Sequence, residues 1–169
     1  YSKLWWVDSA LSLIEDAYGM NFSESGTKMN NLTIGFTEVG NDYLAQTSSR
    51  NGTMLMSYNM DDCVGINTYN GSSKDGRYSY SDYYLDRVTA HELTHAVMFA
   101  NVNNTNELPQ FLMEGLAELI SGADDARAYY IEELADNTEE LSSCLDLNDT
   151  STGNSPVYAA GYMALRYLA

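Results

Sequence analysis

Basic residues and cysteine are scarce in this chain, and each shortage excludes a class of protein. Its 8 lysines and arginines face 24 acidic residues, giving a net charge of −16 over 169 residues, so a nucleic acid would be repelled at long range. No apolar run approaches the length of a membrane span. We therefore expect neither a nucleic-acid partner nor a membrane span.

Cys63 and Cys144 are the only cysteines, and their wide separation excludes a CxxC metal knuckle and a dense disulfide scaffold. They either form one disulfide or remain two thiols, since a sequence does not measure their distance in space. The calcium loop of an EF-hand is also absent. The excess of carboxylates still leaves room for a bound Ca²⁺, which no pattern here locates.

The first half of the chain predicts a helix followed by a small mixed sheet. Apolar residues recur at helical spacing from Lys3 to Gly19, which indicates an amphipathic helix that ends at the glycine. Between Asn30 and Asn70, short runs rich in Thr, Ile, Val and Tyr alternate with turn residues. The predicted strands are LTIGFTEV, YLAQTSS, TMLMSYN and VGINTY.

The second half is predicted to be mainly helical. The first expected helix contains the two histidines and starts at Ser81 or Asp82. A second covers PQFLMEGLAELIS (109–121) and is capped by Gly122, and a third, on the surface, covers ARAYYIEELADNTEEL (126–141). The last runs from Ser155 to the end. We expect one α+β domain over 1–169, with the helix and sheet in 1–80 and the helical half in 81–169. Because the closing residues YMALRYLA still follow a helical pattern, we also expect a piece excised from a larger chain.

The stretch DRVTAHELTHAVMFA contains both histidines of the chain, His91 and His95. Residues four apart lie on one face of a helix, so both rings can bind a single ion at about 2.0–2.1 Å. A catalytic zinc needs a third protein ligand and an open position for water. Glu114 is the candidate ligand, because it lies on the next predicted helix.

Two further glutamates have the positions that zinc-dependent hydrolysis requires. Glu92 lies about 100° around the helix from His91, so it reaches the water on the ion rather than the ion. Zinc lowers the pKa of its water to about 7, and a carboxylate there can move the proton to a leaving amine. Glu118, one turn after Glu114, is placed to accept a hydrogen bond from a histidine N–H. Gly115 removes a side chain where two helices must approach closely.

A plainer interpretation is that these are ordinary helix histidines and that Glu114 and Glu118 form a solvated charged pair. HExxH is a short pattern that also occurs by chance. The zinc interpretation is favoured because both histidines of the chain are in the motif, a glutamate-bearing helix follows, and the far side of the motif helix is apolar, with Leu93, Val97 and Ala100. In the second helix we expect Leu112, Leu116, Leu119 and Ile120 to face the core, opposite the side with Gln110, Phe111, Glu114, Ala117 and Glu118.

The motif HELTH, followed by EGLAE, resembles the gluzincin metallopeptidases, within them the bacterial collagenase-like branch with its HExTH and Trp-Phe-x-Glu-Gly-x-Ala-Glu pattern. LWWVDSALSLIEDAYG, YYLDRVTAHELTHAVM and YAAGYMALRYLA are similar to flagellinolysins, metallopeptidase domains inserted in the outward-facing region of some bacterial flagellins. The similarity spans nearly the whole chain and is weakest from Asn21 to Asn70. Phe111-Leu112 departs from the family's Trp-Phe pair.

The resemblance implies a zincin-like fold in which His91, His95 and Glu114 bind zinc, Glu92 is the general base, and Glu118 supports a ligand. Related peptidases stabilise the oxyanion with a tyrosine or histidine. The candidates here are Tyr158, which the resemblance favours, and Tyr162, although each can also be just a packed aromatic residue.

The resemblance also implies a protein or peptide substrate, bound extended along a sheet edge that the segment from Thr53 to Tyr69 should provide. The resemblance implies an extracellular domain that is embedded in a bacterial flagellin polymer. A secreted stand-alone metalloprotease and a non-catalytic surface or filament module remain the alternatives.

Overall fold

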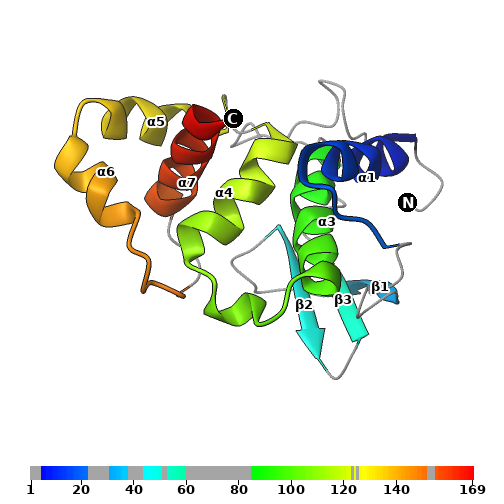
Figure 1. Ribbon diagram of the computed structural model, residues 1–169. Helices are drawn as coiled ribbons and strands as arrows, with labels where there is room; N and C mark the ends of the chain where they lie inside the picture. Colours follow the sequence, from blue (N-terminus) through cyan, green and yellow to red (C-terminus); the bar gives the residue numbers. More distant parts are fainter. Residues whose placement is uncertain are drawn as a thin grey trace. The chain divides into compact units, whose positions relative to one another are not determined.

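The computed structural model describes residues 5–22, 31–37, 44–50, 53–59, 85–122, 124, 126–151 and 155–169 (Figure 1). Over these residues the protein is α+β, which confirms the predicted class. In chain order the elements are α1 (Trp5–Tyr18), β1 (Leu32–Thr37), β2 (Ala45–Arg50), β3 (Thr53–Asn59), α3 (Leu85–Asn101), a short 3-10 helix η2 (Thr105–Glu107), α4 (Gln110–Ser121), α5 (Ala128–Ala135), α6 (Thr138–Cys144) and α7 (Ser155–Leu168). They form two compact units, Tyr1–Asn103 and Asn104–Ala169.

Helix α1 ends as its sequence predicts. Gly19 adopts a φ of +65°, a left-handed conformation that glycine takes without steric cost. Its N–H donates to the Glu15 carbonyl at 2.8 Å, so the helix closes there. The inner face of α1 buries Ala10 and Ile14.

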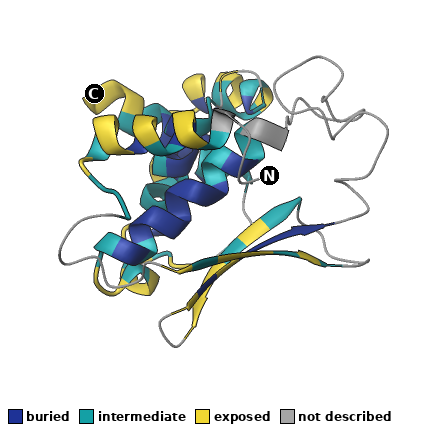
Figure 2. Ribbon diagram, turned by 90° about the vertical axis from the view of Figure 1, so that its right-hand side faces the viewer, coloured by how far each residue is buried: buried dark blue, intermediate teal, exposed yellow. Residues whose placement is uncertain are grey.

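The described sheet has the strand order β1-β3-β2, with β3 parallel to β1 and antiparallel to β2. β3 is the most buried strand, between two more exposed neighbours (Figure 2). Three of the four predicted strands are therefore confirmed, and VGINTY lies outside the described residues.

The central place of β3 corrects one expectation about the substrate edge. Residues Thr53–Asn59 have β1 on one side and β2 on the other, so their backbone groups are already paired. This part of the segment from Thr53 to Tyr69 does not form an edge, and residues 60–69 lie outside the described part. Among the described strands, β1 and β2 are the edges.

Helix α3 packs on the sheet and on α1 within the first unit (Figure 1). Leu93, Val97 and Ala100 are all buried, as the apolar far side of the motif helix predicts. Met54 of β3 forms a buried cluster with Ala96 and Ala100. The sequence was right that the HExxH helix is a core helix.

In the second unit, α4 and α7 cross where each has a glycine. A Cβ built on Gly115 would lie 2.6 Å from the Gly161 carbonyl carbon, and one built on Gly161 would lie 2.0 Å from the Phe111 carbonyl oxygen. Both distances are far below any real Cβ contact. The close helix approach predicted at Gly115 is confirmed, and Gly161 is its counterpart.

Leu134, Ala159 and Ala160 form the buried apolar cluster of this unit. Cys144 packs against it as a free thiol, and burial raises its pKa. Cys63 lies outside the described residues. None of the described helices is long and apolar enough to cross a membrane.

Two predictions for the second unit were wrong in detail. The single helix expected over 126–141 is two helices, α5 and α6, because the Asn137 side chain accepts a hydrogen bond from the Glu140 N–H at 3.1 Å and starts a new helix.

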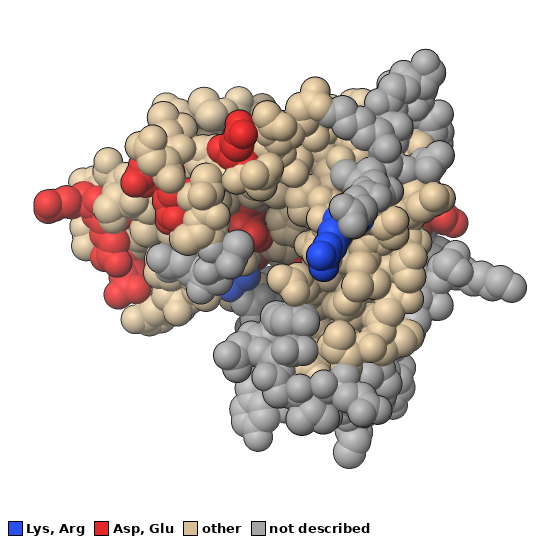
Figure 3. Space-filling view, turned by 90° about the horizontal axis from the view of Figure 1, so that it is seen from below, with Lys and Arg blue, Asp and Glu red and all other residues tan. Residues whose placement is uncertain are grey.

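Exposed carboxylates line both helices, and Figure 3 shows acidic side chains gathered on this part of the surface. These carboxylates are Glu132, Glu133, Asp136, Glu139 and Glu140.

The second error concerns the buried face of α4. The residues that are buried are Gln110, Gly115, Ala117, Glu118 and Ile120, whereas Leu112, Leu116 and Leu119 are only half-buried. The polar side of the helix faces inward because the Glu118 carboxylate has a buried cationic partner, Arg127. The plainer interpretation, in which Glu114 and Glu118 form a solvated pair, is therefore excluded for Glu118.

Candidate metal centre

The two histidines lie one helical turn apart on α3, with their ring nitrogens facing each other. Their Nε2 atoms are 3.1 Å apart and the rings meet edge to face. Two nitrogens on a tetrahedral ion at about 2.0–2.1 Å lie about 3.3 Å from each other. The pair of His91 and His95 thus already has the spacing that a shared ion requires.

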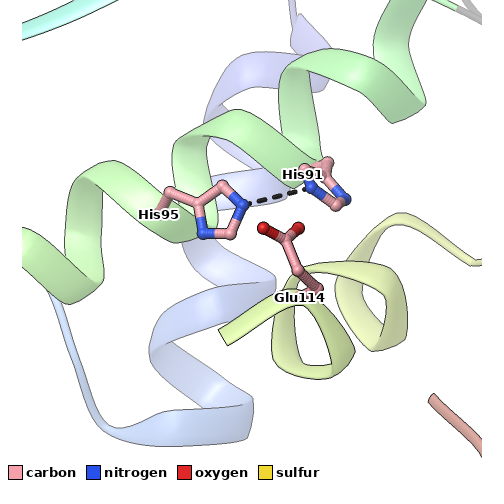
Figure 4. A group of neighbouring side chains, drawn as sticks. All are labelled: His91, His95 and Glu114. Carbon is pink, nitrogen blue, oxygen red and sulfur yellow. Dashed lines mark hydrogen bonds between the residues drawn. The ribbon is translucent and has the colours of Figure 1, made fainter. Parts of the chain in front are cut away.

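Glu114 provides the third candidate ligand. One ligand atom from each of His91, His95 and Glu114 lies within 4.8 Å of the others, and Figure 4 shows the three side chains turned toward one another. Two imidazoles and one carboxylate are donors that suit Zn²⁺. Among the described residues, this group could hold a metal ion.

Glu92 lies on α3 between the two histidines in sequence and is only 6% exposed. Its Oε2 atom is buried and has no hydrogen-bond partner in the described part of the chain. A buried carboxylate oxygen without a partner costs roughly 1–3 kcal/mol or more, so most proteins avoid one. An acceptor of this kind beside two metal-binding residue types is suited to take a proton from water.

The backbone around this motif is fixed from the sheet side. The Thr47 hydroxyl of β2 donates to the Glu92 carbonyl at 3.1 Å. Tyr58 of β3 shares a hydrogen bond of 2.6 Å with Thr89, just before His91. Inside the motif, the Thr94 hydroxyl donates to the Ala90 carbonyl at 2.9 Å. These bonds hold the turn of α3 that presents His91, Glu92 and His95.

Glu118 lies one turn after Glu114 and is 3% exposed. Its Oε1 accepts from Arg127 Nε at 3.1 Å and from Arg127 Nη2 at 2.7 Å. Two N–H groups of one guanidinium therefore converge on the same carboxylate oxygen. The predicted bond from a histidine N–H to Glu118 stays a prediction.

The two candidate oxyanion donors on α7 differ in their surroundings. Tyr162 is 4% exposed, and its hydroxyl accepts a hydrogen bond from Arg166. Tyr158 is half-buried, and the Arg127 guanidinium carbon lies 4.8 Å from its ring centre. A phenol oxygen that accepts from an arginine can still donate its own proton, so these contacts do not decide between the two tyrosines, and the choice of Tyr158 stays a prediction.

Comparisons with protein-family models, curated proteins and solved structures find no match to this chain. The interpretation of the centre therefore depends on its own geometry and chemistry, together with the motif resemblance.

Two residues around the centre were not anticipated from the sequence. Thr47 has no local signal, because its hydroxyl reaches a residue 45 positions later in the chain. Arg127 does have a weak signal, since it is one of only 8 basic residues and lies within an acidic segment. A basic residue in an acidic segment could have been predicted to pair with a buried glutamate, here Glu118 of α4.

Proposed function

We propose that this protein is a zinc-dependent endopeptidase with a zincin-like (gluzincin) fold that hydrolyses peptide bonds of extracellular proteins. The observation that carries the proposal is the grouping of His91, His95 and Glu114 within 4.8 Å, next in sequence to a buried glutamate. A structural histidine pair would not need a carboxylate from another helix beside it. Nor would it need a second, unpartnered carboxylate oxygen on the motif helix.

In this proposal His91, His95 and Glu114 hold the zinc. When bound, the ion acts as a Lewis acid that makes a water molecule acidic enough to react near neutral pH. Glu92 Oε2 accepts a proton from the attacking water and later delivers it to the amine that leaves. The proton that Glu92 takes from water is the one that it returns to the amine, so the side chain is unchanged over the cycle.

Tyr158 donates a hydrogen bond from its phenol to the oxygen that becomes negative during the attack. Such a donor contributes about 10²–10³ in rate. With the ion bound, Glu118 would accept a hydrogen bond from a ligand histidine and so fix the ring nitrogen that faces the ion.

The substrate is proposed to bind as an extended strand along the outer edge of β2. Among the strands that the structure describes, β2 pairs with β3 alone, and a strand edge of this kind can accept a peptide through main-chain hydrogen bonds. Thr47 of the same strand is bonded to the Glu92 carbonyl. A peptide added at this edge would therefore have its register set relative to the residue that bears the base.

The proposed location is the surface of a bacterial flagellar filament. It rests on the similarity to the flagellin-inserted peptidases and on a net charge of −16, which suits an exposed protein. Antibodies to this chain should label filaments on intact cells of its source. Labelling confined to the culture medium would instead indicate a secreted stand-alone peptidase.

The decisive experiment replaces Glu92 with glutamine. Glu92→Gln should retain one zinc per chain and lose at least about 10²-fold in kcat on an unfolded protein substrate, because the amide cannot accept the proton. The matched control is Glu132→Gln, the same change at an exposed glutamate of α5, which should leave kcat unchanged. If the zinc-loaded wild type cleaves no member of a broad peptide library, the chain is a non-catalytic module and the proposal fails.

A further inference from the structure

Arg127 and Glu118 form a buried ion pair within the second unit. The Arg127 side chain is 10% exposed and that of Glu118 is 4% exposed, and two guanidinium N–H groups converge on one carboxylate oxygen. Desolvating both charges costs about as much as their attraction returns, so such a pair is a poor device for stability alone. Because Glu118 is on α4, the helix that also bears Glu114, we looked for a role of this ion pair in positioning side chains.

The same guanidinium group also contacts an aromatic ring. Its central carbon lies 4.8 Å from the centre of the Tyr158 ring, within the range of a cation–π contact. A planar guanidinium can donate from its edge while its face covers a ring, which a lysine ammonium cannot do. Arg127 therefore links a carboxylate on α4 to a phenol on α7.

A second arginine–tyrosine pair on α7 provides an internal contrast. Arg166 lies over the Tyr162 ring at 5.5 Å and pairs with Asp124 at 2.8 Å, but its side chain is 60% exposed. Exposed pairs of this kind contribute little. The two pairs share their residue types and differ in burial and in the carboxylate that they reach.

We propose that Arg127 is a positioning residue of the peptidase reaction: it holds the Tyr158 ring and the Glu118 carboxylate in one fixed arrangement. This inference rests on the proposed function, in which Tyr158 stabilises the oxyanion and Glu118 orients a ligand histidine. Arg127 acts through these two residues. A ring held from its face keeps its hydroxyl in one direction, which is what an oxyanion donor needs before the substrate arrives.

The kinetic test uses Arg127→Met and Arg127→Lys, with Arg166→Met as the matched control. Arg127→Met should lower kcat about 10-fold or more, up to the 10²–10³ of a lost oxyanion donor, with KM little changed. Arg127→Lys should keep the fold and the charge yet recover little of kcat. Arg166→Met should remain within about 2-fold of the wild type.

Coupling separates positioning from general damage to the fold. If Arg127 acts through Tyr158, Arg127→Met should lower kcat by a clearly smaller factor in a Tyr158→Phe background than in the wild type, since the phenol is already gone and only the effect through Glu118 is left. Fully additive losses would overturn the proposal. So would a wild-type kcat in Arg127→Met.

A readout without metal or substrate completes the test. In zinc-free protein with ring-labelled tyrosine, the Tyr158 signal, assigned by its loss in Tyr158→Phe, should shift and sharpen in both Arg127 variants and stay in place in Arg166→Met. An unchanged Tyr158 signal in the folded Arg127 variants overturns the positioning role. Absence of peptidase activity in the zinc-loaded wild type would instead overturn the proposed function, so the two failures are distinguishable.

Discussion

The Tyr58 hydroxyl and the Thr89 hydroxyl share a buried hydrogen bond of 2.6 Å that connects β3 to α3 just before His91. Tyr58 is 1% exposed and Thr89 is 3% exposed, so neither hydroxyl can turn to solvent instead. The Tyr58 hydroxyl also reaches the Met56 sulfur at 3.2 Å. This bond connects the sheet to the helix turn that presents the two histidines of the candidate metal centre.

Tyr58→Phe should therefore destabilise the fold more than the loss of one oxygen suggests. The substitution leaves the Thr89 hydroxyl buried without its partner, which costs about 1–3 kcal/mol in the free energy of unfolding. Thr89→Val should cost a similar amount, and the double variant should cost less than the sum, because no polar group is then stranded. Urea unfolding measures all three.

Tyr167→Phe is the matched control, since Tyr167 is 90% exposed and should shift the free energy of unfolding by less than about 0.5 kcal/mol. If the loss of unfolding free energy in the double variant equals the sum of the losses in Tyr58→Phe and Thr89→Val, the two hydroxyls do not depend on each other.

Local signals were sufficient to predict most helices and strands. Gly19 and Gly122 end α1 and α4 because both adopt positive φ values that glycine tolerates, at 65° and 76°. The four-residue spacing of His91 and His95 sets their common face in any helix. These features depend only on neighbours along the chain, so the sequence contains them directly.

Features that depend on distant partners were not predictable in the same way. The central place of β3 depends on which strands pair, and strand pairing joins segments far apart in the chain. The inward polar face of α4 depends on Arg127, whose burial cannot be derived from the periodicity of α4 itself. The break between α5 and α6 has a different cause, because it follows from a local N-cap, Asn137, whose signal is weaker than the helical pattern around it.

Gly161→Ala should be among the most damaging single-methyl changes in this protein. The added carbon would lie 2.0 Å from the Phe111 carbonyl oxygen, which belongs to the backbone of α4 and cannot rotate away. Overpacking a core costs about 1–3 kcal/mol when side chains can adjust, so about 3 kcal/mol or more is expected here. Thermal and urea unfolding measure the loss.

Gly35→Ala makes the same chemical change where there is room. The nearest atom to its added carbon is Leu55 Cδ1 at 3.4 Å, an ordinary contact with a flexible side chain. The free energy of unfolding should change by less than about 1 kcal/mol. Equal losses for Gly35→Ala and Gly161→Ala would contradict the close backbone contact of α4 with α7.

Zinc should stabilise this protein through His91, His95 and Glu114. A ligand that binds only the folded state adds about 2.7 kcal/mol at a concentration 100 times its Kd, so zinc should raise the Tm of chelator-treated protein. Alanine at any one of the three positions removes a ligand and should weaken zinc binding by more than the 10–100-fold typical of a supporting residue. Calorimetric titration of the metal-free protein measures this directly.

Glu107→Ala serves as the control for this series, because Glu107 is an exposed residue of η2. It should bind zinc with the affinity of the wild type and show the same rise in Tm. A His95→Ala protein that still binds zinc as tightly as the wild type would show that the ion binds elsewhere, and His91 and His95 would then be an ordinary hydrogen-bonded pair. Loss of zinc in the His95 and Glu114 variants alike is the result that requires one shared ion.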